Sequence, residues 1–219
     1  MKDKLVKNDA GRWVPLEING EPVIPYQGVG KYIPLGHKYA PPLPSCALYP
    51  GDGNKMVGSL REALEKAGLR DGMTISTHHH LRDGDFVANM VFDIAHEMGV
   101  KNLRWFPSAS FPCNNHLISY LEEGTIRHME GSMNGSLGEF TSRGKMQKTA
   151  VLRSHGGRVQ AIQDGEVKID IAVIAAPSAD PFGNANGLTG PSATGVLSYA
   201  DMDVRYATHV IMVTDNLVS

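Results

Sequence analysis

Apolar residues recur along this chain with two periods, one typical of helices and the other of strands. Between residues 59 and 68 they lie three and four positions apart, which predicts a helix capped by Ser59 and Glu62. The same spacing predicts a second helix, which Gly99 ends. Its apolar stripe consists of Val87, Met90, Val91, Ile94, Ala95 and Met98. A third, shorter helix is predicted between residues 114 and 124.

Short apolar runs between these helices predict strands. They lie at residues 73–77, 103–106, 126–129, 149–152, 170–176 and 209–213. Residues 159–163 and 166–169 flank Asp164-Gly165, which is typical of a β-hairpin. The glycine-rich stretch 131–144 is interpreted as a functional or mobile loop. Because strands alternate with helices, we expect an α/β fold with an open, mostly parallel sheet flanked by helices.

The first 55 residues differ from the rest of the chain. They contain eight of the chain's 13 prolines, a density that excludes helices and central strands. They also contain Trp13, Tyr26, Tyr32, Tyr39 and Tyr49, whereas disordered tails are usually poor in aromatic residues. We therefore predict a Pro-rich arm at residues 1–55, docked on a domain or a partner, and an α/β domain at residues 56–219.

Charge and composition exclude several classes of function. The net charge is −2, without the basic excess of a nucleic-acid-binding protein. No apolar run approaches the length that crosses a membrane, and the N-terminus lacks the apolar region of a secretory signal. We expect a cytoplasmic protein. Its two cysteines, Cys46 and Cys113, are too few for a disulfide framework and are predicted to be reduced thiols.

Three polar stretches follow predicted strands, at residues 73–85, 153–158 and 174–187. Ligands of open α/β sheets bind in the crevice at the carboxyl ends of the strands. Each stretch places histidine, glycine, asparagine or aspartate where an apolar run ends. The sequence therefore predicts one composite site built from all three.

The first stretch contains His78, His79 and His80. On an extended chain His78 and His80 share a face, so a metal site would need a third ligand from elsewhere, such as His155 or His116. The interpretation we favour is that the imidazoles bind a substrate carboxylate or a thioester oxygen. A purely structural role is the remaining alternative.

The second stretch is Ser154-His155-Gly156-Gly157-Arg158. Adjacent Ser and His rarely form a nucleophile and base, and no G-x-S-x-G elbow is present. Two glycines would let a ligand approach the main chain, and the Arg158 fork could bind a phosphate or carboxylate. The alternative is a tight turn that leads into the predicted hairpin.

The third stretch follows the most apolar strand and contains Asp180, Gly183 and Asn184. Flexible residues here would expose backbone N–H groups that stabilise a developing oxyanion, unless the loop merely connects two elements. Glu130 and Glu139 flank residues 131–138, the first part of the glycine-rich stretch. Either carboxylate could act as a nucleophile or base, although glutamates near loops are more often only solvated.

Five segments together resemble a known family. They are MTISTHHHLRDGD, NGSLGEFTSRGKM, SHGGR, GEVKIDIAVIAAPSADPFGNANG and VIMVTDNLV. These segments resemble the alpha chains of citrate lyase, the citrate CoA-transferase component, which are related to the class I CoA-transferases. The resemblance implies a fold of the NagB/RpiA/CoA-transferase type. It also implies exchange of acetate for citrate on an acyl-carrier thioester, giving citryl-carrier and acetate.

The resemblance further implies a hetero-oligomer with the beta subunit and the acyl-carrier (gamma) subunit of citrate lyase. No cofactor is expected on this chain, because the CoA-like prosthetic group is carried by the acyl-carrier subunit. The expected ligands are citrate, acetate and thioesters of the acetyl-CoA type. The residues expected to bind substrate and thioester are Thr77, His78, His79, His80, Ser154, His155, Gly156, Gly157, Arg158, Asp180, Gly183 and Asn184.

One departure limits the transfer of function. Alpha chains of the family hold two similar halves, and this chain resembles the N-terminal one. The glutamate nucleophile of class I CoA-transferases lies in the other half or subunit, so the resemblance does not assign it to Glu130 or Glu139. Exchange through a mixed anhydride would need no such nucleophile, and no catalytic residue is assigned. The alternatives are a non-catalytic half that binds the carrier and partner subunits, or a metal-dependent hydrolase.

Overall fold

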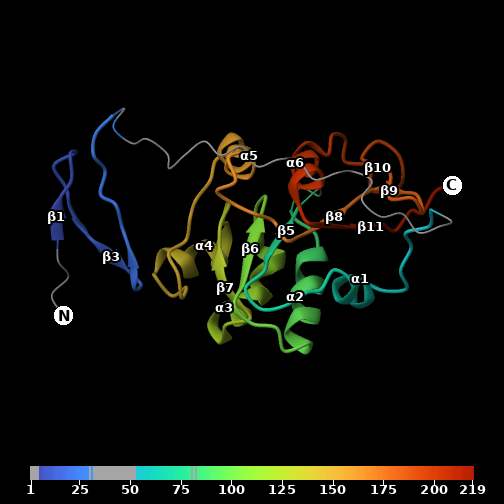
Figure 1. Ribbon diagram of the computed structural model, residues 1–219, viewed down its shortest axis with the longest axis horizontal. Helices are drawn as coiled ribbons and strands as arrows, with labels where there is room; N and C mark the ends of the chain where they lie inside the picture. Colours follow the sequence, from blue (N-terminus) through green and yellow to red (C-terminus); the bar gives the residue numbers. More distant parts are fainter. Residues whose placement is uncertain (1–4, 30, 32–52, 80, 82) are drawn as a thin grey trace.

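The computed structural model describes residues 5–29, 31, 53–79, 81 and 83–219 (Figure 1). Its helices are α1 (Leu60–Lys66), α2 (Val87–Glu97), the 3₁₀ helix η1 (Pro112–Leu117), α3 (Ile118–Glu123), α4 (Gly135–Ser142), α5 (His155–Gln163) and α6 (Ser198–Tyr206). Its strands are β1 (Leu5–Lys7), β2 (Trp13–Pro15), β3 (Glu17–Ile18), β4 (Glu21–Pro22), β5 (Thr74–Thr77), β6 (Leu103–Pro107), β7 (Ile126–Met129), β8 (Ile171–Ala175), β9 (Ser178–Ala179), β10 (Ala185–Asn186) and β11 (His209–Val213).

The central sheet has the order β11-β8-β5-β6-β7, and every neighbouring pair in it is parallel. The chain builds β5, β6 and β7 outward in one direction, then returns to place β8 on the other side of β5. Because the strands are parallel, all their carboxyl ends meet at one edge of the sheet, where α/β proteins bind ligands. The predicted α/β class with a mostly parallel sheet is confirmed.

Helices cover both faces of this sheet, so its strands are apolar on both sides. Alternate residues of β6 show the arrangement: Trp105 belongs to the core under α2 and α3, and Phe106 to the core under α5. Figure 1 shows α5 and α6 on one side of the sheet and α1, α2 and α3 on the other. Arg158 of α5 and Asp203 of α6 are thereby buried against the strands.

The predicted hairpin around Asp164-Gly165 is wrong, and the structure has helix α5 there instead. Ser154 caps this helix by accepting a hydrogen bond from the Gly157 N–H at 3.1 Å. At the other end of the helix Asp164 is the C-cap residue, and Gly165 after it adopts the left-handed conformation with φ 72°. An Asp-Gly pair satisfies a helix C-terminus as well as it satisfies a hairpin turn, so the sequence signal was ambiguous.

Two further predictions between β7 and α5 are also wrong. The stretch 131–144 is not only a loop, because it contains α4, whose Leu137 and Phe140 are buried. Residues 149–152 do not form a strand and contribute only one isolated bridge, between Glu130 and Val151. The segment instead crosses from one face of the sheet to the other.

Within α2 the predicted stripe is rotated slightly. Met90 is 46% exposed, while Ala88 and Phe92 are buried. The predicted capping of α1 is confirmed for Ser59, whose side chain accepts from the Glu62 N–H. Helix α6 was not predicted at all, although it supplies a residue on which the site depends.

The described part of the N-terminal arm forms two short hairpins, β1-β2 and β3-β4, which extend beyond the α/β body (Figure 1). It contacts the body near the β3-β4 turn, where Glu21 pairs with Lys148 at 2.7 Å. Trp13 is 67% exposed, so this part is not docked on the body as a whole. Docking on a partner stays a prediction, and Tyr32, Tyr39 and Tyr49 lie outside the described residues. Among the described helices, none has the length and apolar character needed to cross a membrane.

The two tryptophans of the chain provide a matched test of the core. Trp105 is fully buried and donates from Nε1 to Thr77 Oγ1 at 2.9 Å. We expect Trp105→Phe to lower the free energy of unfolding by about 1–3 kcal/mol, because it leaves a void and an unpaired hydroxyl. Trp13→Phe should change it by less than about 0.5 kcal/mol. Urea denaturation followed by circular dichroism measures both, and equal effects would contradict the described core.

Candidate functional site

A cavity of about 180 Å³ lies at the carboxyl edge of the sheet, next to the first turn of α5. It is lined by Ser108, Gly131, Ser132, Arg153, Ser154, His155, Arg158 and Tyr199. These residues come from the ends of β6 and β7, from the start of α5 and from α6. A larger hollow, of about 350 Å³, lies between α3 and α4; Glu139 lines it, but none of the residues expected to bind substrate or thioester does.

The main chain shapes one wall of the cavity. The Ser108 N–H donates to the Thr77 carbonyl at 3.0 Å, and the Gly131 N–H donates to the Val151 carbonyl at 2.9 Å. Gly131 has φ 139°, and a Cβ there would lie 2.4 Å from the carbonyl oxygen of Pro107. Only glycine therefore lets the β7 segment approach the end of β6 this closely.

Under the cavity, four buried side chains form one polar network. Arg158 of α5 donates from Nη1 to Asp203 Oδ1 at 3.1 Å and from Nη2 to Ser76 Oγ at 2.7 Å. His78 Nε2 lies 2.6 Å from Asp203 Oδ2, and the Ser76 hydroxyl also donates to that oxygen. Asp203 of α6 thus connects α5 and α6 to the end of β5.

Opposing effects act on the Asp203 carboxyl. Burial alone would raise its pKa, but His78 and Arg158 outweigh this effect and lower the pKa to about 2. Because this value lies below the usual 3.8, the resulting stabilisation is present above pH 3.8 and is lost as the pH falls toward 2. At neutral pH the ionised carboxylate therefore neutralises Arg158.

This network changes the role expected for Arg158. The guanidinium is 2% exposed, lies 4.6 Å above the Phe106 ring and directs both terminal nitrogens at internal partners. Its fork therefore binds the carboxylate of Asp203, in the way the sequence analysis expected it to bind a ligand. Similarly, Thr77 uses its hydroxyl to accept from Trp105 in the core.

Two imidazoles lie nearer to solvent. His79 is half-buried, and its Nδ1 lies 2.8 Å from Ser108 Oγ. Burial, followed by the charges of His78 and His155, lowers the pKa of His79 and favours its neutral form. His155 is exposed and stacks on Tyr199, with ring centroids 5.5 Å apart. His80 lies outside the described residues.

The remaining residues of the second stretch belong to the first turn of α5. Ser154 Oγ accepts from Gly157, so it serves as a helix cap, which does not support a role as nucleophile. Gly156 is exposed. The start of α5 brings the positive end of its dipole to the cavity.

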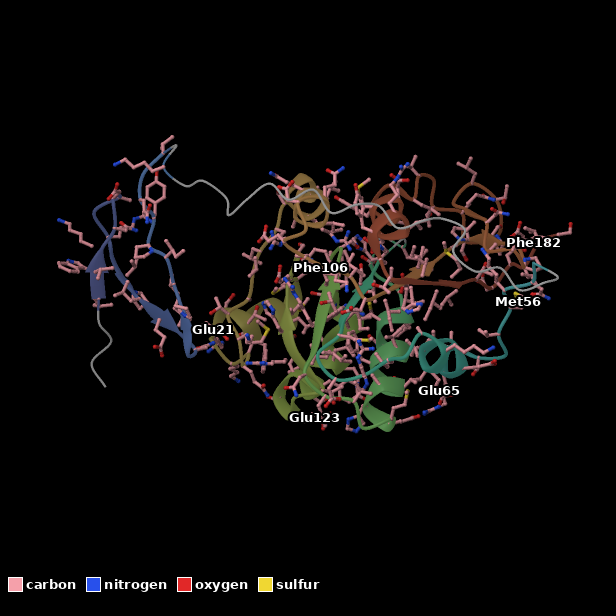
Figure 2. All side chains as sticks on the ribbon, in the orientation of Figure 1. Glu21, Met56, Glu65, Phe106, Glu123 and Phe182 are labelled. Atoms are coloured by element: carbon pink, nitrogen blue, oxygen red, sulfur yellow. The ribbon has the colours of Figure 1, made fainter. Side chains whose placement is uncertain are left out.

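The third stretch lies elsewhere on the same edge of the sheet. Asp180 accepts from Asn184 and from the Phe182 N–H, and Gly183 packs near Lys55. Neighbouring hydrogen bonds lower the pKa of Asp180, that from the Asn184 side chain most. In Figure 2, Phe182 lies at the β9-β10 end of the molecule, away from Phe106 under α5. The structure thus brings the first two stretches together through the buried Asp203 network, and only the second stretch lines the cavity.

Neither of the two candidate glutamates, Glu130 and Glu139, has a free carboxylate. Glu130 is 2% exposed and pairs with Arg104 and with Arg153, whose Nε lies 2.9 Å from Glu130 Oε2. Glu139 is exposed and pairs with Arg143 at 2.6 Å. Across the described ranges, no group of three or more His, Cys, Asp or Glu side chains could hold a metal ion.

Comparison with known proteins agrees with the resemblance. Residues 53–219 match the family described as "Citrate lyase, alpha subunit". The chain belongs to the citrate lyase alpha subunit family. The chain is also similar to a solved structure, described as the alpha subunit of citrate lyase from Streptococcus mutans in complex with citrate. It is 37% identical, with a TM-score of 0.83, over 96% of this chain and 41% of that one.

Curated relatives in the citrate lyase alpha family extend well beyond this chain. The citrate lyase alpha chain of Haemophilus influenzae is 42% identical over 165 residues, which are 75% of this chain and 33% of the relative. That of Escherichia coli is 42% identical over 75% of this chain and 32% of the relative. The chain therefore spans about a third of the length of the curated alpha chains it matches.

Sequence reasoning missed Asp203, Ser76, Ser108 and Tyr199 in this alpha subunit chain. A signal for α6 exists, because Ala200, Asp203 and Ala207 are all buried and follow a helical spacing. An aspartate on such a face indicates a buried charge that requires a partner.

The Asp203 network can be tested on its own helix. We expect Asp203→Asn to lower the free energy of unfolding by about 3–5 kcal/mol, because it leaves Arg158 buried without a counter-charge. Asp201→Asn removes an exposed pair with Arg205 and should cost less than about 0.5 kcal/mol. Chemical denaturation at pH 7 measures both. A cost for Asp203→Asn as small as that for Asp201→Asn would refute the network.

Proposed function

We propose that this chain supplies part of a citrate CoA-transferase, which exchanges acetate for citrate on an acyl-carrier thioester to give citryl-carrier and acetate. The observation that carries the proposal is the cavity at the carboxyl edge of the sheet, whose only charged or ionisable lining groups among the described residues are Arg153, Arg158, His155 and Tyr199. Such a lining suits an anion, and the Streptococcus mutans relative was crystallised with citrate.

The size of the cavity supports a small acid as its occupant. Its volume of about 180 Å³ lies below the roughly 300–1,000 Å³ of pockets that enclose drug-sized ligands. A polycarboxylate therefore fits better than a whole CoA-like group. The loop that holds Asp180, Gly183 and Asn184 is exposed at the same edge and is proposed to contact the carrier group outside the cavity.

The chemistry proposed needs no nucleophile from this chain. An oxygen of a citrate carboxylate attacks the acetyl carbonyl carbon, and the C–S bond breaks to release the carrier thiolate and a mixed anhydride. The thiolate then attacks the citryl carbonyl carbon and releases acetate. Holding the two reactants together contributes about 7 kcal/mol or more to lowering the barrier. Each hydrogen-bond donor to the developing oxyanion contributes about 3 kcal/mol.

Residues around the cavity have separable roles in this proposal. His155 and the first N–H groups of α5 donate toward the oxyanion, where the helix dipole favours negative charge. His79, neutral and fixed by Ser108, would donate to or accept from a substrate oxygen. His78 and Arg158 position the start of α5 through Asp203.

The proposed partners are the beta and acyl-carrier (gamma) subunits of citrate lyase, in a cytoplasmic hetero-oligomer. The CoA-like prosthetic group belongs to the carrier, and no cofactor is proposed on this chain. Exposed apolar residues of the arm, such as Trp13 and Ile24, at 67% and 70% exposure, are proposed to contact these subunits.

One observation favours a second candidate, a half that binds carrier and partners without catalysing exchange. No acidic side chain lines the cavity among the described residues, and both Glu130 and Glu139 are paired. A covalent step of the class I type would therefore need a glutamate from elsewhere.

Mass spectrometry of the carrier separates the two candidates. Acetylated carrier and citrate are incubated with this chain alone, and with this chain co-expressed with the remaining segment of a full-length alpha chain. We expect citryl-carrier in the co-expressed sample. The mass gained identifies citrate against other di- and tricarboxylates.

The distribution of product decides between the candidates. Citryl-carrier formed by the chain alone would show that its cavity suffices for exchange. Product only with the second segment would favour the binding half. If both preparations are folded and neither forms citryl-carrier, the proposed function is wrong.

A further inference from the structure

Arg153 differs from the other arginine of the cavity in how its nitrogens are used. Its Nε is fixed from behind, 2.9 Å from Oε2 of the buried Glu130. Its outer edge pairs with Glu166, with Nη2 to Oε1 at 2.7 Å and Nη1 to Oε2 at 3.4 Å. The Arg153 side chain is 12% exposed, whereas that of Glu166 is 62% exposed. Arg153 therefore has one buried carboxylate partner, Glu130, and one solvent-exposed partner, Glu166.

The buried anchor holds Arg153 in place without Glu166. Arg104 pairs with the other oxygen of Glu130, so each oxygen of this carboxylate has an arginine partner. Burial, followed by the charge of Arg153, lowers the pKa of Arg104. The outer nitrogens of Arg153 could thus change partner while the side chain keeps its direction.

Arg158 offers no such exchangeable edge. Its carboxylate partner, Asp203, is fully buried and also bonded to His78 and Ser76. A ligand could replace Asp203 at the terminal nitrogens of Arg158 only by disrupting the packing of α6. Among the described lining residues, Arg153 is therefore the one arginine whose partner is a solvent-exposed carboxylate.

We propose that Arg153 is the residue that binds a carboxylate of the substrate, and that Glu166 occupies this edge of the guanidinium until the substrate replaces it. The fork of Arg153 matches one carboxylate in bidentate geometry, and Glu166 already demonstrates that geometry internally. The inference rests on the proposed function, and it assigns the anion-binding role to Arg153 in place of Arg158.

The exchange is energetically accessible because exposed ion pairs are weak. Such pairs contribute about 0.2–1 kcal/mol, which corresponds to about a 1.4- to fivefold change in affinity. Glu166 therefore acts as an internal competitor that weakens carboxylate binding slightly and discriminates against ligands unable to form the bidentate contact. Removing it should strengthen binding, whereas removing an ordinary binding residue weakens it.

Isothermal titration calorimetry with citrate tests whether removal of Glu166 raises the affinity for citrate. The 219-residue chain, Glu166→Gln and Glu139→Gln are compared at the same pH and salt concentration. Glu139→Gln is the matched control, since it also removes one negative charge and one exposed pair with an arginine. We expect Glu166→Gln to bind citrate about two- to fivefold more tightly, and Glu139→Gln to bind it as the unaltered chain does.

A second pair of variants shows whether the gain acts through Arg153. Arg153→Lys keeps the charge but loses the fork, and should bind citrate at least about tenfold more weakly. Adding Glu166→Gln to Arg153→Lys should give no further gain. Thermal denaturation checks that each variant is folded. If Arg153→Lys does not fold, the comparison of Glu166→Gln with Glu139→Gln still tests the proposal, because Glu166→Gln leaves the buried pairs of Glu130 intact.

The outcomes are distinct. If the unaltered chain binds citrate and Glu166→Gln binds it no more tightly, the proposed role of Glu166 and Arg153 is wrong. The proposed function still stands in that case. An equal gain in Glu139→Gln also overturns this role, because the effect would then be one of net charge. Absence of citrate binding in every folded variant refutes the proposed function, and the inference with it.

Discussion

The structure around the cavity depends on one buried carboxylate. Asp203 lies on α6, its main partner Arg158 lies on α5, and His78 and Ser76 lie at the end of β5. A carboxylate without counter-charges would be too costly to bury here, so the three elements must assemble together for any of them to be satisfied. The position of the first turn of α5, and with it one side of the cavity, follows from this single requirement.

This constraint separates two arginines that look equivalent in the sequence. Arg153 and Arg158 are five residues apart, on either side of Ser154-His155-Gly156-Gly157. The helical turn between them directs Arg158 inward to Asp203 and leaves Arg153 at the rim, next to Glu130. One arginine thus stabilises the fold and the other faces the space where a ligand would lie. The sequence analysis assigned ligand contacts to the two glycines and to the fork of Arg158, yet the fold uses those glycines in the first turn of a helix and turns the fork inward.

The sequence predicted the sheet well and its connections poorly. Strands such as β8 are buried on both faces, so their composition alone identifies them. The Asp164-Gly165 pair ends a helix as readily as it turns a hairpin, and only packing of Ala161 and Ile162 against the sheet decides between them. Asp203 was missed for a related reason. A charged residue in a helix of mixed composition is assigned to the solvent-exposed face, unless a buried partner distant in the sequence is known. Of the three predicted strand-end segments, the first two meet in the buried network under the cavity, where His78 and Arg158 share Asp203. Contacts of this kind depend on the long-range topology of the chain, which local sequence patterns do not reveal.

Gly131 has a consequence for how selectivity in this cavity could change. Its backbone lies so close to Pro107 that a side chain cannot be accommodated there, which makes this wall of the cavity main chain. The backbone atoms of this wall keep their position whatever rotamers the side chains adopt, and a point substitution does not readily move them. Variation in ligand size among related proteins must therefore come from the side chains that line the cavity, such as those of Ser108, Ser132 and Tyr199. The backbone at Gly131 is fixed while these side chains can differ in volume, so they set the size of the ligand that the cavity can accept.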